Sequence, residues 1–317
     1  MENIIPHVVC FGEILWDNMP EGRKPGGAPM NVAYHLNQLG INSTLISKVG
    51  TDQNGIDLLK FINEKGLSTE FCQKDAVYKT STVEVNIGAD HEVKYEIVAP
   101  VAWDFIVPEE RLGHLVSAAD AFVFGSLAVR NTVSLKTLQI LLEKANYKVF
   151  DVNLREPHFS KESIALLLHQ TDLLKLNIHE LNLISTWFDN SCQSEWERIR
   201  VLQEQFRIKE IVVTKGAKGA TYYTESAQFN FSSFPVEVND TVGSGDSFLA
   251  GFLSQKLTNG DIQESLTSAS ALGAYVTTHA GACPEYKKYD LNRFIWEIEL
   301  KKNQQLIDNE PGQSKNL

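Results

Sequence analysis

Short, almost wholly apolar segments alternate along the chain with longer segments in which apolar residues recur every three or four positions. The longer segments predict helices, among them Pro29–Leu39, Gly55–Lys65 and Val133–Ala145. The alternation favours an α/β fold, with a mostly parallel sheet and helices on both of its faces. The short segments predict its buried strands, at His7–Leu15, Ser43–Val49, Ala121–Phe124, Lys148–Val152, Leu173–Leu176 and Glu210–Thr214.

Two segments interrupt this alternation. Lys79–Ile87 and Val93–Val98 alternate polar with apolar residues on either side of Gly88-Ala-Asp90, where another helix would be expected. This pattern predicts a β-hairpin with one face in water. A second hairpin is predicted from Ala220–Tyr223 and Gln228–Phe234. The fold therefore includes a small β unit besides the main sheet.

Composition and charge exclude several classes of protein. The chain has 317 residues, 43% hydrophobic and 22% charged, which is typical of a globular protein. Its 29 basic and 40 acidic residues give a net charge of −11, which argues against nucleic acid or an anionic membrane as a partner. No stretch approaches the ~18 apolar residues of a membrane span.

Cysteine spacing and the chain ends complete the outline. The four cysteines lie far apart with no C-x-x-C pair, and the first residues lack a signal sequence, so we expect a cytoplasmic protein with free thiols. We see no internal repeat and no linker. Residues 1–303 are expected to form one domain, with residues 304–317 as a polar tail that frays from about Lys302.

Three common catalytic motifs are missing. None of the 20 glycines is followed by Lys, so there is no Walker-type phosphate loop. Gly243 and Gly245 form the only G-x-G pair, and Phe248 stands where a dinucleotide fingerprint needs its third glycine. No H-x-x-x-H pattern supports a zinc hydrolase. Phosphate-loop, nicotinamide and zinc enzymes are therefore disfavoured.

The strongest positive signal is the segment from Asp240 to Asp246, which opens an apolar helix. Its glycines lie at the helix N-terminus, where free N–H groups and the helix dipole favour an anion. Glycine lets that backbone approach a phosphate closely. Asp246, in the first turn, suits either a catalytic role or simple stabilisation of the helix.

Three weaker segments lie at expected strand ends or in the loops after them. Pro25–Asn31 is a second glycine-rich turn before a helix, Asn177–Glu180 places two oxygen-bearing side chains on one helix face, and Thr214–Gly216 ends a strand. Each alone suits a structural role: a tight loop, a capping box and a turn. Their shared position is where open α/β sheets bind ligands.

Together these segments resemble the ribokinase-like (PfkB) carbohydrate kinase family, from Val8 to about Tyr286. Gly26–Asn31 and Asp240–Asp246 look like the two family signatures, although Ser244 stands where the family more often has Ala. The first strand and sugar loop of the family are similar to Cys10–Glu13 with Asp17, and its D-x-N-x-R strand end is similar to Asp151–Arg155. The family's lid is similar to the hairpin at 79–98. The FGE and PGGAP segments and Val101–Asp104 look most like bacterial fructokinases.

The resemblance implies a ribokinase-like sheet with a β lid (strands within about 12–30 and 78–101), ATP with Mg²⁺ and K⁺, and a homodimer formed through the lids. It also implies a role for each site residue. At the transferred phosphoryl group these are Asp246, as the base, with Gly243, Ser244, Gly245 and Arg155. At the sugar they are Asp17, Gly26, Gly27, Asn31, Trp103 and Asp246, and at ATP they are Thr214, Lys215, Gly216, Gly243, Gly245 and Asn177. The resemblance also implies Asn177 and Glu180 at Mg²⁺, through water, and Asp240 at K⁺.

Some alternatives stay open at this stage. Arg155 suits a salt bridge to Asp151 as well as a phosphate contact, Trp103 suits a core or hinge position, and Asp17 is expected on a loop after the first strand. The expected activity is transfer of the γ-phosphoryl group of ATP to a hydroxymethyl group of a small sugar, D-fructose first. The alternatives are a kinase for ribose, a nucleoside or 2-keto-3-deoxygluconate, and a non-catalytic sensor.

Overall fold

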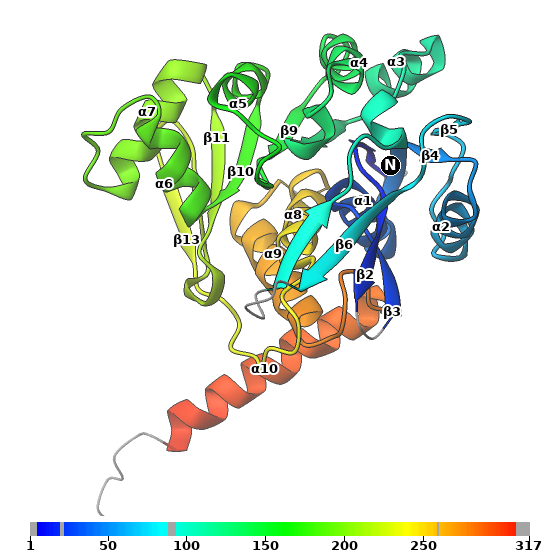
Figure 1. Cartoon of the computed structure of the whole chain (residues 1–317). Coiled ribbons are helices and arrows are strands. Elements are labelled where there is room, and N and C mark those ends of the chain that lie inside the picture. The colour runs from blue at the N-terminus through cyan, green and yellow to red at the C-terminus, as the bar shows by residue number, and fades with distance from the viewer. Residues whose placement is uncertain (1–4, 20–21, 88–92, 259, 309–317) are drawn as a thin grey trace, which may run out of the picture.

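A nine-stranded sheet forms the centre of the molecule, in the order β13-β12-β11-β10-β9-β8-β1-β4-β5 (Figure 1). We describe it from a computed structural model, for residues 5–19, 22–87, 93–258 and 260–308. Every pairing from β11 to β5 is parallel, and β12 and β13 add an antiparallel hairpin at one edge. The strands are β1 (His7–Phe11), β4 (Asn42–Gly50), β5 (Cys72–Asp75), β8 (Ala121–Gly125), β9 (Lys148–Asp151), β10 (Leu173–Asn177), β11 (Glu210–Thr214), β12 (Ala220–Tyr223) and β13 (Gln228–Phe231).

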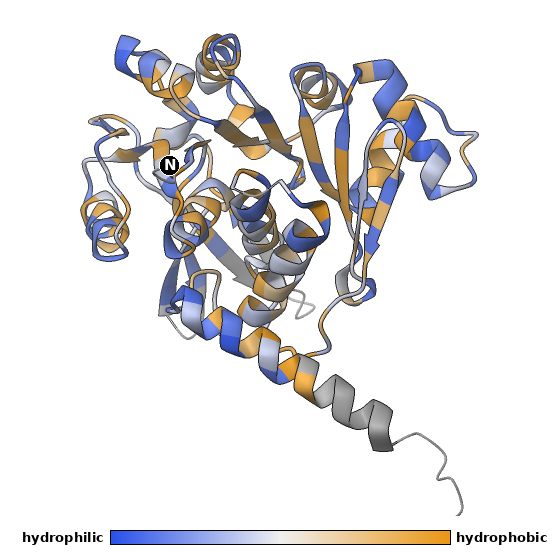
Figure 2. Cartoon of the chain, turned by 180° about the vertical axis from the view of Figure 1, so that it is seen from behind, coloured by the Kyte–Doolittle hydropathy of each residue, from blue (hydrophilic) through white to orange (hydrophobic). Residues whose placement is uncertain are grey.

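Helices cover both faces of this sheet, as the alternation predicted. Successive strand residues point to opposite faces, so Val8 and Cys10 join one apolar core while Val9 and Phe11 join the other. Figure 2 shows the apolar side of the helices turned towards the strands. The first core is covered by α1 (Ala28–Gln38), α2 (Gln53–Glu64), α8 (Ser244–Lys256), α9 (Ile262–Thr277) and α10 (Lys288–Asp308), and the second by α3 (Glu110–Ser117), α4 (Thr132–Leu142), α5 (Lys161–Leu168), α6 (Ile178–Thr186) and α7 (Glu195–Phe206).

A second, four-stranded sheet has the order β3-β2-β6-β7, built from β2 (Leu15–Met19), β3 (Gly22–Gly26), β6 (Ser81–Ile87) and β7 (Val93–Ile97). The antiparallel pair β6–β7 confirms the predicted hairpin, whose turn at 88–90 lies outside the described residues. The single strand predicted for His7–Leu15 is wrong. The chain leaves β1 at Gly12, whose φ of 146° suits glycine and whose missing Cβ makes room for Pro29.

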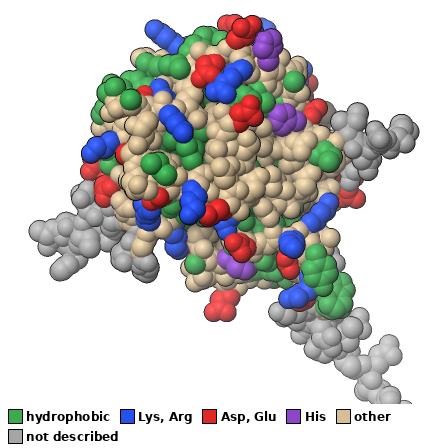
Figure 3. Space-filling model, turned by 90° about the vertical axis from the view of Figure 1, so that its right-hand side faces the viewer, with side chains coloured by type: hydrophobic (Ala, Val, Ile, Leu, Met, Phe, Trp, Pro, Cys, Tyr) green, Lys and Arg blue, Asp and Glu red, His purple; other side chains and the backbone are tan. Residues whose placement is uncertain are grey.

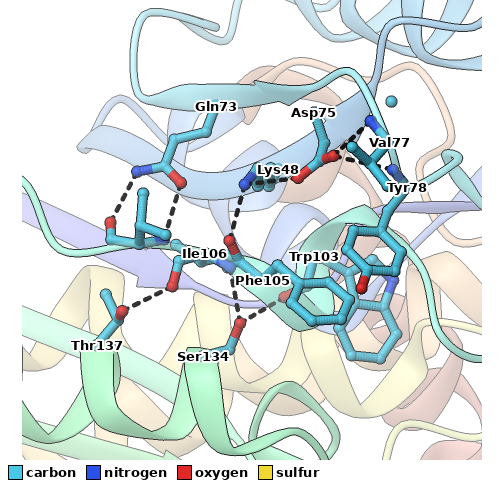
Figure 4. Close-up of polar contacts among 12 residues, drawn as sticks. Lys48, Gln73, Asp75, Val77, Tyr78, Trp103, Phe105, Ile106, Ser134 and Thr137 are labelled. Carbon is cyan, nitrogen blue, oxygen red and sulfur yellow. Dashed lines mark hydrogen bonds and ion pairs between the residues drawn. The ribbon is translucent and has the colours of Figure 1, made fainter.

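The chain that follows β7 is anchored to the main body by buried polar contacts (Figure 4). Lys48 on β4 donates to the carbonyl of Phe105 and pairs with Asp75, at 2.9 and 2.7 Å. The side-chain amide of Gln73 contacts both backbone groups of Val107. The 3₁₀ helix η1 (Ala102–Phe105) is therefore held firmly where the small sheet returns to the core. Two further 3₁₀ turns are η2 (Leu127–Val129) and η3 (Gly216–Lys218).

The C-terminal segment differs from expectation. α10 continues to Asp308, beyond residues 302–304, where we expected a frayed tail to begin; residues 309–317 lie outside the described part. In Figure 1 this helix extends away from the rest of the molecule. Within the described residues, no helix has the length and apolar character needed to cross a bilayer. On the face shown in Figure 3, positive and negative side chains are interspersed.

Candidate active site

The predicted site residues gather at the carboxyl ends of the parallel strands. β1, β9, β10 and β11 run in the same direction, so the residues that follow them meet at one edge of the sheet. α1 and α8 begin beside each other, because the side chain of Asn31 in α1 donates to the carboxylate of Asp246 in α8 at 2.8 Å. Pro29 of α1 lies against Gly12 after β1, and Gly245 of α8 lies against Lys175 of β10, which places both starts at this edge. The structure thus brings together two glycine-rich segments that are 215 residues apart in the sequence.

The start of α8 is an open helix N-terminus. Gly243, the residue before the helix, has φ 75°, and a Cβ there would lie 2.7 Å from the Cα of Ala282. Only glycine fits this backbone without strain. In the described part of the chain, the N–H groups of Gly245 and Asp246 donate to no protein acceptor. They are therefore available to an anion.

Asp246 is a buried carboxyl group with an altered acidity. Asp246 is only 8% exposed. Burial and the nearby carboxylate of Asp151 raise its pKa to about 6, against the lowering effects of Lys175, Asn31 and Arg155. A carboxyl group with a pKa close to neutrality can exchange a proton at physiological pH. The Asp246 carboxylate accepts from the side chain of Asn31, and within the described residues it accepts from no N–H group of the α8 start.

Lys175 is a site residue that sequence analysis missed. It lies on β10 directly opposite Asp151 of β9, and its ammonium nitrogen is 2.9 and 3.0 Å from the two carboxylate oxygens. A Cβ placed on Gly245 would lie 2.9 Å from that nitrogen. The signal that was available is a lysine within an otherwise apolar buried strand, since parallel strands of this kind rarely contain one.

Asp151 therefore pairs with Lys175, and the alternative of a salt bridge between Asp151 and Arg155 is wrong. The Arg155 guanidinium donates to the carbonyl of Leu154 and is exposed. Its positive charge lowers the pKa values of three carboxyl groups, in Glu13, Asp17 and Asp246. Arg155 therefore adds positive charge near the acidic groups of the site.

The start of α1 is closed by a carboxylate from another part of the chain. Gly27 precedes the helix with φ 118° and offers no side-chain cap, and the carboxylate of Glu13 accepts from the N–H of Ala28 at 3.3 Å instead. Burial raises the pKa of Glu13 to about 7. Among the described residues, the second oxygen of this carboxylate has no hydrogen-bond partner. Glu13 ends the Cys10–Glu13 motif, and the sequence pattern indicated no role for its side chain.

Asp17 lies close to these groups, in the small sheet. It belongs to β2, where it pairs with Lys24 of β3, so its placement on a loop was wrong. A Cβ on Gly26 would contact the Asp17 carboxylate, so a larger residue at position 26 would displace that side chain. Burial raises the pKa of Asp17 to about 6, and Arg155 partly offsets this effect.

Asn177 and Glu180 form the capping box that we had weighed against a metal role. The Asn177 side chain accepts from the N–H groups of His179 and Glu180, and the Glu180 carboxylate accepts from the N–H groups of Asn177 and Leu154. No cluster of three or more metal-binding side chains occurs within the described residues. Each Glu180 oxygen keeps a lone pair, so the pair fits a hydrated Mg²⁺ held through water.

Asp240 links the start of the α8 segment to a later loop. One oxygen of its carboxylate accepts from the N–H of Val242 and the other from the N–H of Gly281, at 3.0 and 2.9 Å. Gly281 follows α9, so Asp240 joins its own loop to the one that comes after that helix. Its role in binding K⁺ stays a prediction.

Two further expectations change with the structure. Lys215, at the end of β11, pairs with Glu195 of α7 at 2.7 Å and donates to Thr221, so its ammonium is already engaged. Thr214 and Gly216 lie beside it at the same sheet edge as Asn177. Trp103 is 0% exposed and packs beneath Arg130, whose guanidinium carbon is 4.0 Å from the ring centre. Trp103 is a core residue and presents no surface to a sugar.

Comparison with known proteins agrees with this geometry. The family model of the pfkB family carbohydrate kinases matches residues 10–288. The chain is 29% identical over 304 residues to a fructokinase of Solanum tuberosum, covering 87% of this chain and 91% of that protein. It is 27% identical over 309 residues to probable fructokinase-3 of Arabidopsis thaliana, covering 87% of each.

Solved structures agree as well. A double mutant of the Vibrio cholerae O395 fructokinase, crystallised with fructose, ADP and potassium ion, superposes with a TM-score of 0.81 at 25% identity, over 93% of this chain and 100% of that one. The same organism's fructokinase with fructose, ADP and calcium ion gives 0.79 at 26% identity, over 92% and 99%. The family model covers most of the chain, and the fold and the two glycine-rich helix starts fit it: this protein belongs to the pfkB family of carbohydrate kinases.

Proposed function

We propose that this protein is an ATP-dependent fructokinase, which transfers the γ-phosphoryl group of ATP to a hydroxymethyl group of D-fructose. The observation that carries the proposal is the contact between Asn31 and Asp246 at the open start of α8. It puts a buried carboxylate, a polar amide and free N–H groups at one point. The fructose and ADP named with the Vibrio cholerae structures support the choice of substrates.

Asp246 acts as the general base. Its carboxylate accepts the proton of the sugar hydroxymethyl group while that oxygen attacks the γ-phosphorus of ATP. Asn31 holds one carboxylate oxygen at 2.8 Å and so leaves the other oxygen for the proton. The raised pKa of about 6 keeps Asp246 mostly ionised at neutral pH and makes it a better proton acceptor than an ordinary aspartate.

The N–H groups at the start of α8 stabilise the transferred group. Gly243, Ser244 and Gly245 shape the turn, and the N–H groups that follow face the charge that develops on the phosphoryl oxygens. Thr214 and Gly216 contribute backbone contacts to the nucleotide, since the Lys215 side chain is held by Glu195. Arg155 is a second positive charge at the site and pairs with a phosphate when the substrates are bound.

The bound ions have separate positions in this proposal. Asn177 and Glu180 would hold Mg²⁺ through its water shell, and the ion would supply positive charge to the phosphates. Asp240, which joins its own loop to that of Gly281, would help to hold K⁺ beside the start of α8. Glu180→Gln removes a charge and one of the two acceptor oxygens, so the amide keeps the N–H of Asn177 or that of Leu154 but not both. We expect an increased Mg²⁺ requirement and a reduced kcat in a magnesium titration. An unchanged titration curve with a lower melting temperature would leave only the capping role.

The sugar binds between the small sheet and the start of α1. Asp17, Asn31 and the backbone of Gly26 and Gly27 line this region, and a carboxylate accepts hydrogen bonds from two hydroxyl groups at once. The small sheet serves as a lid, which excludes water that would otherwise receive the phosphoryl group. The anchored segment after β7 provides its fixed base.

A substrate panel tests the proposal. ADP release with ATP and Mg²⁺ should be fastest with D-fructose, compared with ribose, a nucleoside and 2-keto-3-deoxygluconate at equal concentrations. Faster turnover of one of the other acceptors would assign the chain to that kinase activity. Binding of sugar and ATP without any ADP release would favour a sensor.

Location and assembly follow from the same proposal. All four cysteines are free, which supports a reducing, cytoplasmic location. We expect a homodimer in which two small sheets meet, as the family resemblance implies. Light scattering after size-exclusion chromatography would give about twice the chain mass of 35.5 kDa. A monomer at micromolar concentration would contradict this part.

A further inference from the structure

Lys175 and Asp151 form a buried ion pair directly beneath the start of α8. Leu173 and Lys175 point towards the core that α8 covers, while the intervening Leu174 points to the other face. Nothing in the parallel strand pairing requires charge here, because apolar residues fill such positions in most α/β sheets. Lys175 is therefore an exception that the fold alone does not explain.

The pair is placed against two parts of the proposed machinery. The Lys175 nitrogen lies so close to Gly245 that a Cβ there would be 2.9 Å away. The charge on Lys175 lowers the pKa of Asp246. Burial lowers the pKa of Lys175 itself, but the carboxylates of Asp151, Asp246 and Glu180 raise it, and the net result is a pKa above the ordinary value for lysine. Lys175 thus stays charged among three carboxylates.

A second buried pair shows what a purely structural one looks like. The Arg130 guanidinium donates to both oxygens of Asp104 and to the carbonyls of Ile97 and Val98, and it stacks on Trp103. Lys175 by contrast donates only to Asp151 in the described part of the chain. An ammonium carries three N–H groups, so one remains for a group that arrives from outside.

Stability does not account for the pair. Removing two charges from water costs more than a typical buried pair returns, and apolar replacements of similar volume are often as stable or more so. Lys175 and Asp151 nevertheless occupy the point where the first turn of α8 meets the sheet. Their position suits charge control at the helix start better than support of the core.

We infer that Lys175, anchored by Asp151, is a positioning residue that holds the Gly245–Asp246 turn and supplies the fixed positive charge beneath the transferred phosphoryl group. The inference rests on the proposed function and deepens it. Asp151 fixes the ammonium, the ammonium orders the turn, and the turn presents its N–H groups and the Asp246 carboxylate. The charge of Lys175 adds to the helix dipole where negative charge accumulates in the transition state.

The test compares three variants with a control. Lys175→Met should lower kcat about 100-fold with the sugar KM nearly unchanged, and Asp151→Asn about 10-fold. Each single variant leaves one buried charge unpaired and should lower the melting temperature. The double variant Lys175→Met/Asp151→Asn removes both charges, so it should regain most of the thermal stability while kcat stays as low as in Lys175→Met.

The control is Lys256→Met, at the opposite end of α8. Lys256 pairs with Glu210 at 2.8 Å, also partly buried, and lies 10 residues beyond Asp246 in the same helix. This variant should change stability but not kcat. If the double variant regains both stability and a kcat within threefold of wild type, the pair is only structural and the inference is wrong.

A binding measurement separates this inference from the proposed function. Calorimetry of a non-hydrolysable ATP analogue and of ADP, with Mg²⁺, needs no turnover. Lys175→Met should weaken binding of the analogue about 10-fold more than binding of ADP, because only the analogue places a charged group near Lys175. Equal effects on both nucleotides would overturn the inference. Wild-type protein that binds both nucleotides but phosphorylates no sugar would instead overturn the proposed function.

Discussion

Two helices of this molecule start at glycine-rich turns, and the two starts are completed in opposite ways. Gly27 before α1 and Gly243 before α8 both have positive φ and offer no side-chain cap. At α1, Glu13 places a carboxylate against the first N–H group. At α8, two N–H groups of the first turn donate to no protein acceptor in the described part of the chain.

The difference shows which start receives an external anion. Both starts attract negative charge, because of the helix dipole and the free N–H groups. The protein supplies an acceptor of its own at α1, the carboxyl group of Glu13, and the α1 start is then suited to neutral hydroxyl groups. At α8 the N–H groups of the first turn stay open, and the Lys175 nitrogen lies next to Gly245. Asn31 and Asp246 join the two starts, so that a hydroxyl group and a phosphoryl group meet between them.

The largest expected effect comes from Asp246 at the open start. Asp246→Asn should lower kcat about 10²–10⁴-fold, because it removes the general base. In wild type, kcat/KM should fall as the pH drops through about 6, where Asp246 becomes protonated. The pKa of Asp246 in the folded protein lies above its value in the unfolded chain, so its contribution to stability is lost as the pH rises through about 6. Above that pH the Asn variant should be more stable than wild type by about 1–3 kcal/mol.

Asp261→Asn is the matched control for this variant, because the side chain of Asp261 caps α9 by accepting from the N–H of Glu264. It should reduce stability slightly and leave turnover intact. Activity of Asp246→Asn within about threefold of wild type would return Asp246 to a capping role.

Gly243→Ala should have the next largest effect, because it deforms the open start itself. The new Cβ would require φ 75° in an L-residue and would meet the backbone of Ala282 at 2.7 Å. A displacement of the turn by about 1 Å is expected to lower kcat about 100-fold. Gly40→Ala is the control, since Gly40 has φ 82° and nothing within 4 Å of its Cβ position. Equal kcat values for the two variants would contradict a special role for the turn.

Asp17→Ala tests the sugar side, next to the closed start. Loss of hydrogen bonds to a charged group costs about 1.5–3 kcal/mol, so kcat/KM for fructose should fall about 10–150-fold. The KM for ATP should change little, because Asp17 belongs to the small sheet beside α1. Steady-state kinetics with each substrate varied in turn gives both values. An unchanged kcat/KM for fructose would remove Asp17 from the sugar site.

Glu13→Gln should have the smallest effect on activity, within about threefold. The amide oxygen can still accept from the N–H of Ala28, so the start of α1 remains closed. The pKa of Glu13 in the folded protein, about 7, lies above its ordinary value, so its contribution to stability is lost as the pH rises through 7. The Gln variant should therefore gain about 1–3 kcal/mol over wild type at pH 8 and nothing at pH 4. A large loss of kcat would show that Glu13 acts in the site.

Much of the fold could be predicted from local pattern. The buried strands from Ala121 to Thr214, the helix after Gly27 and the hairpin at 79–98 all follow from the period of apolar residues and from glycine positions. Asp17 was misplaced because the strand that contains it completes a second sheet, and such pairing depends on β6, far along the chain. Trp103 was wrongly assigned to the sugar site, because a motif resemblance does not indicate whether a side chain is buried.

The candidate site was predictable where its residues belong to motifs, and not where they act through space. Asp246, Asn31 and the glycines stand in recognisable segments. Lys175 and Glu13 have ordinary neighbours in the sequence, and only packing shows that one lies under Gly245 and the other against Ala28. The choice between a metal role and a capping role for Glu180 was left open by its spacing, and the structure shows the capping contacts.

The fold class, the family resemblance and the two glycine-rich helix starts could be predicted from the amino-acid sequence, because periodicity, turn chemistry and motif spacing are local properties of the chain. Which start is closed by a carboxylate and which stays open depends on contacts between distant segments. The tertiary structure also decided that Asp151 pairs with Lys175 rather than Arg155. The physical reason is that burial and charge pairing arise between residues that the sheet brings together, such as Asn31 and Asp246.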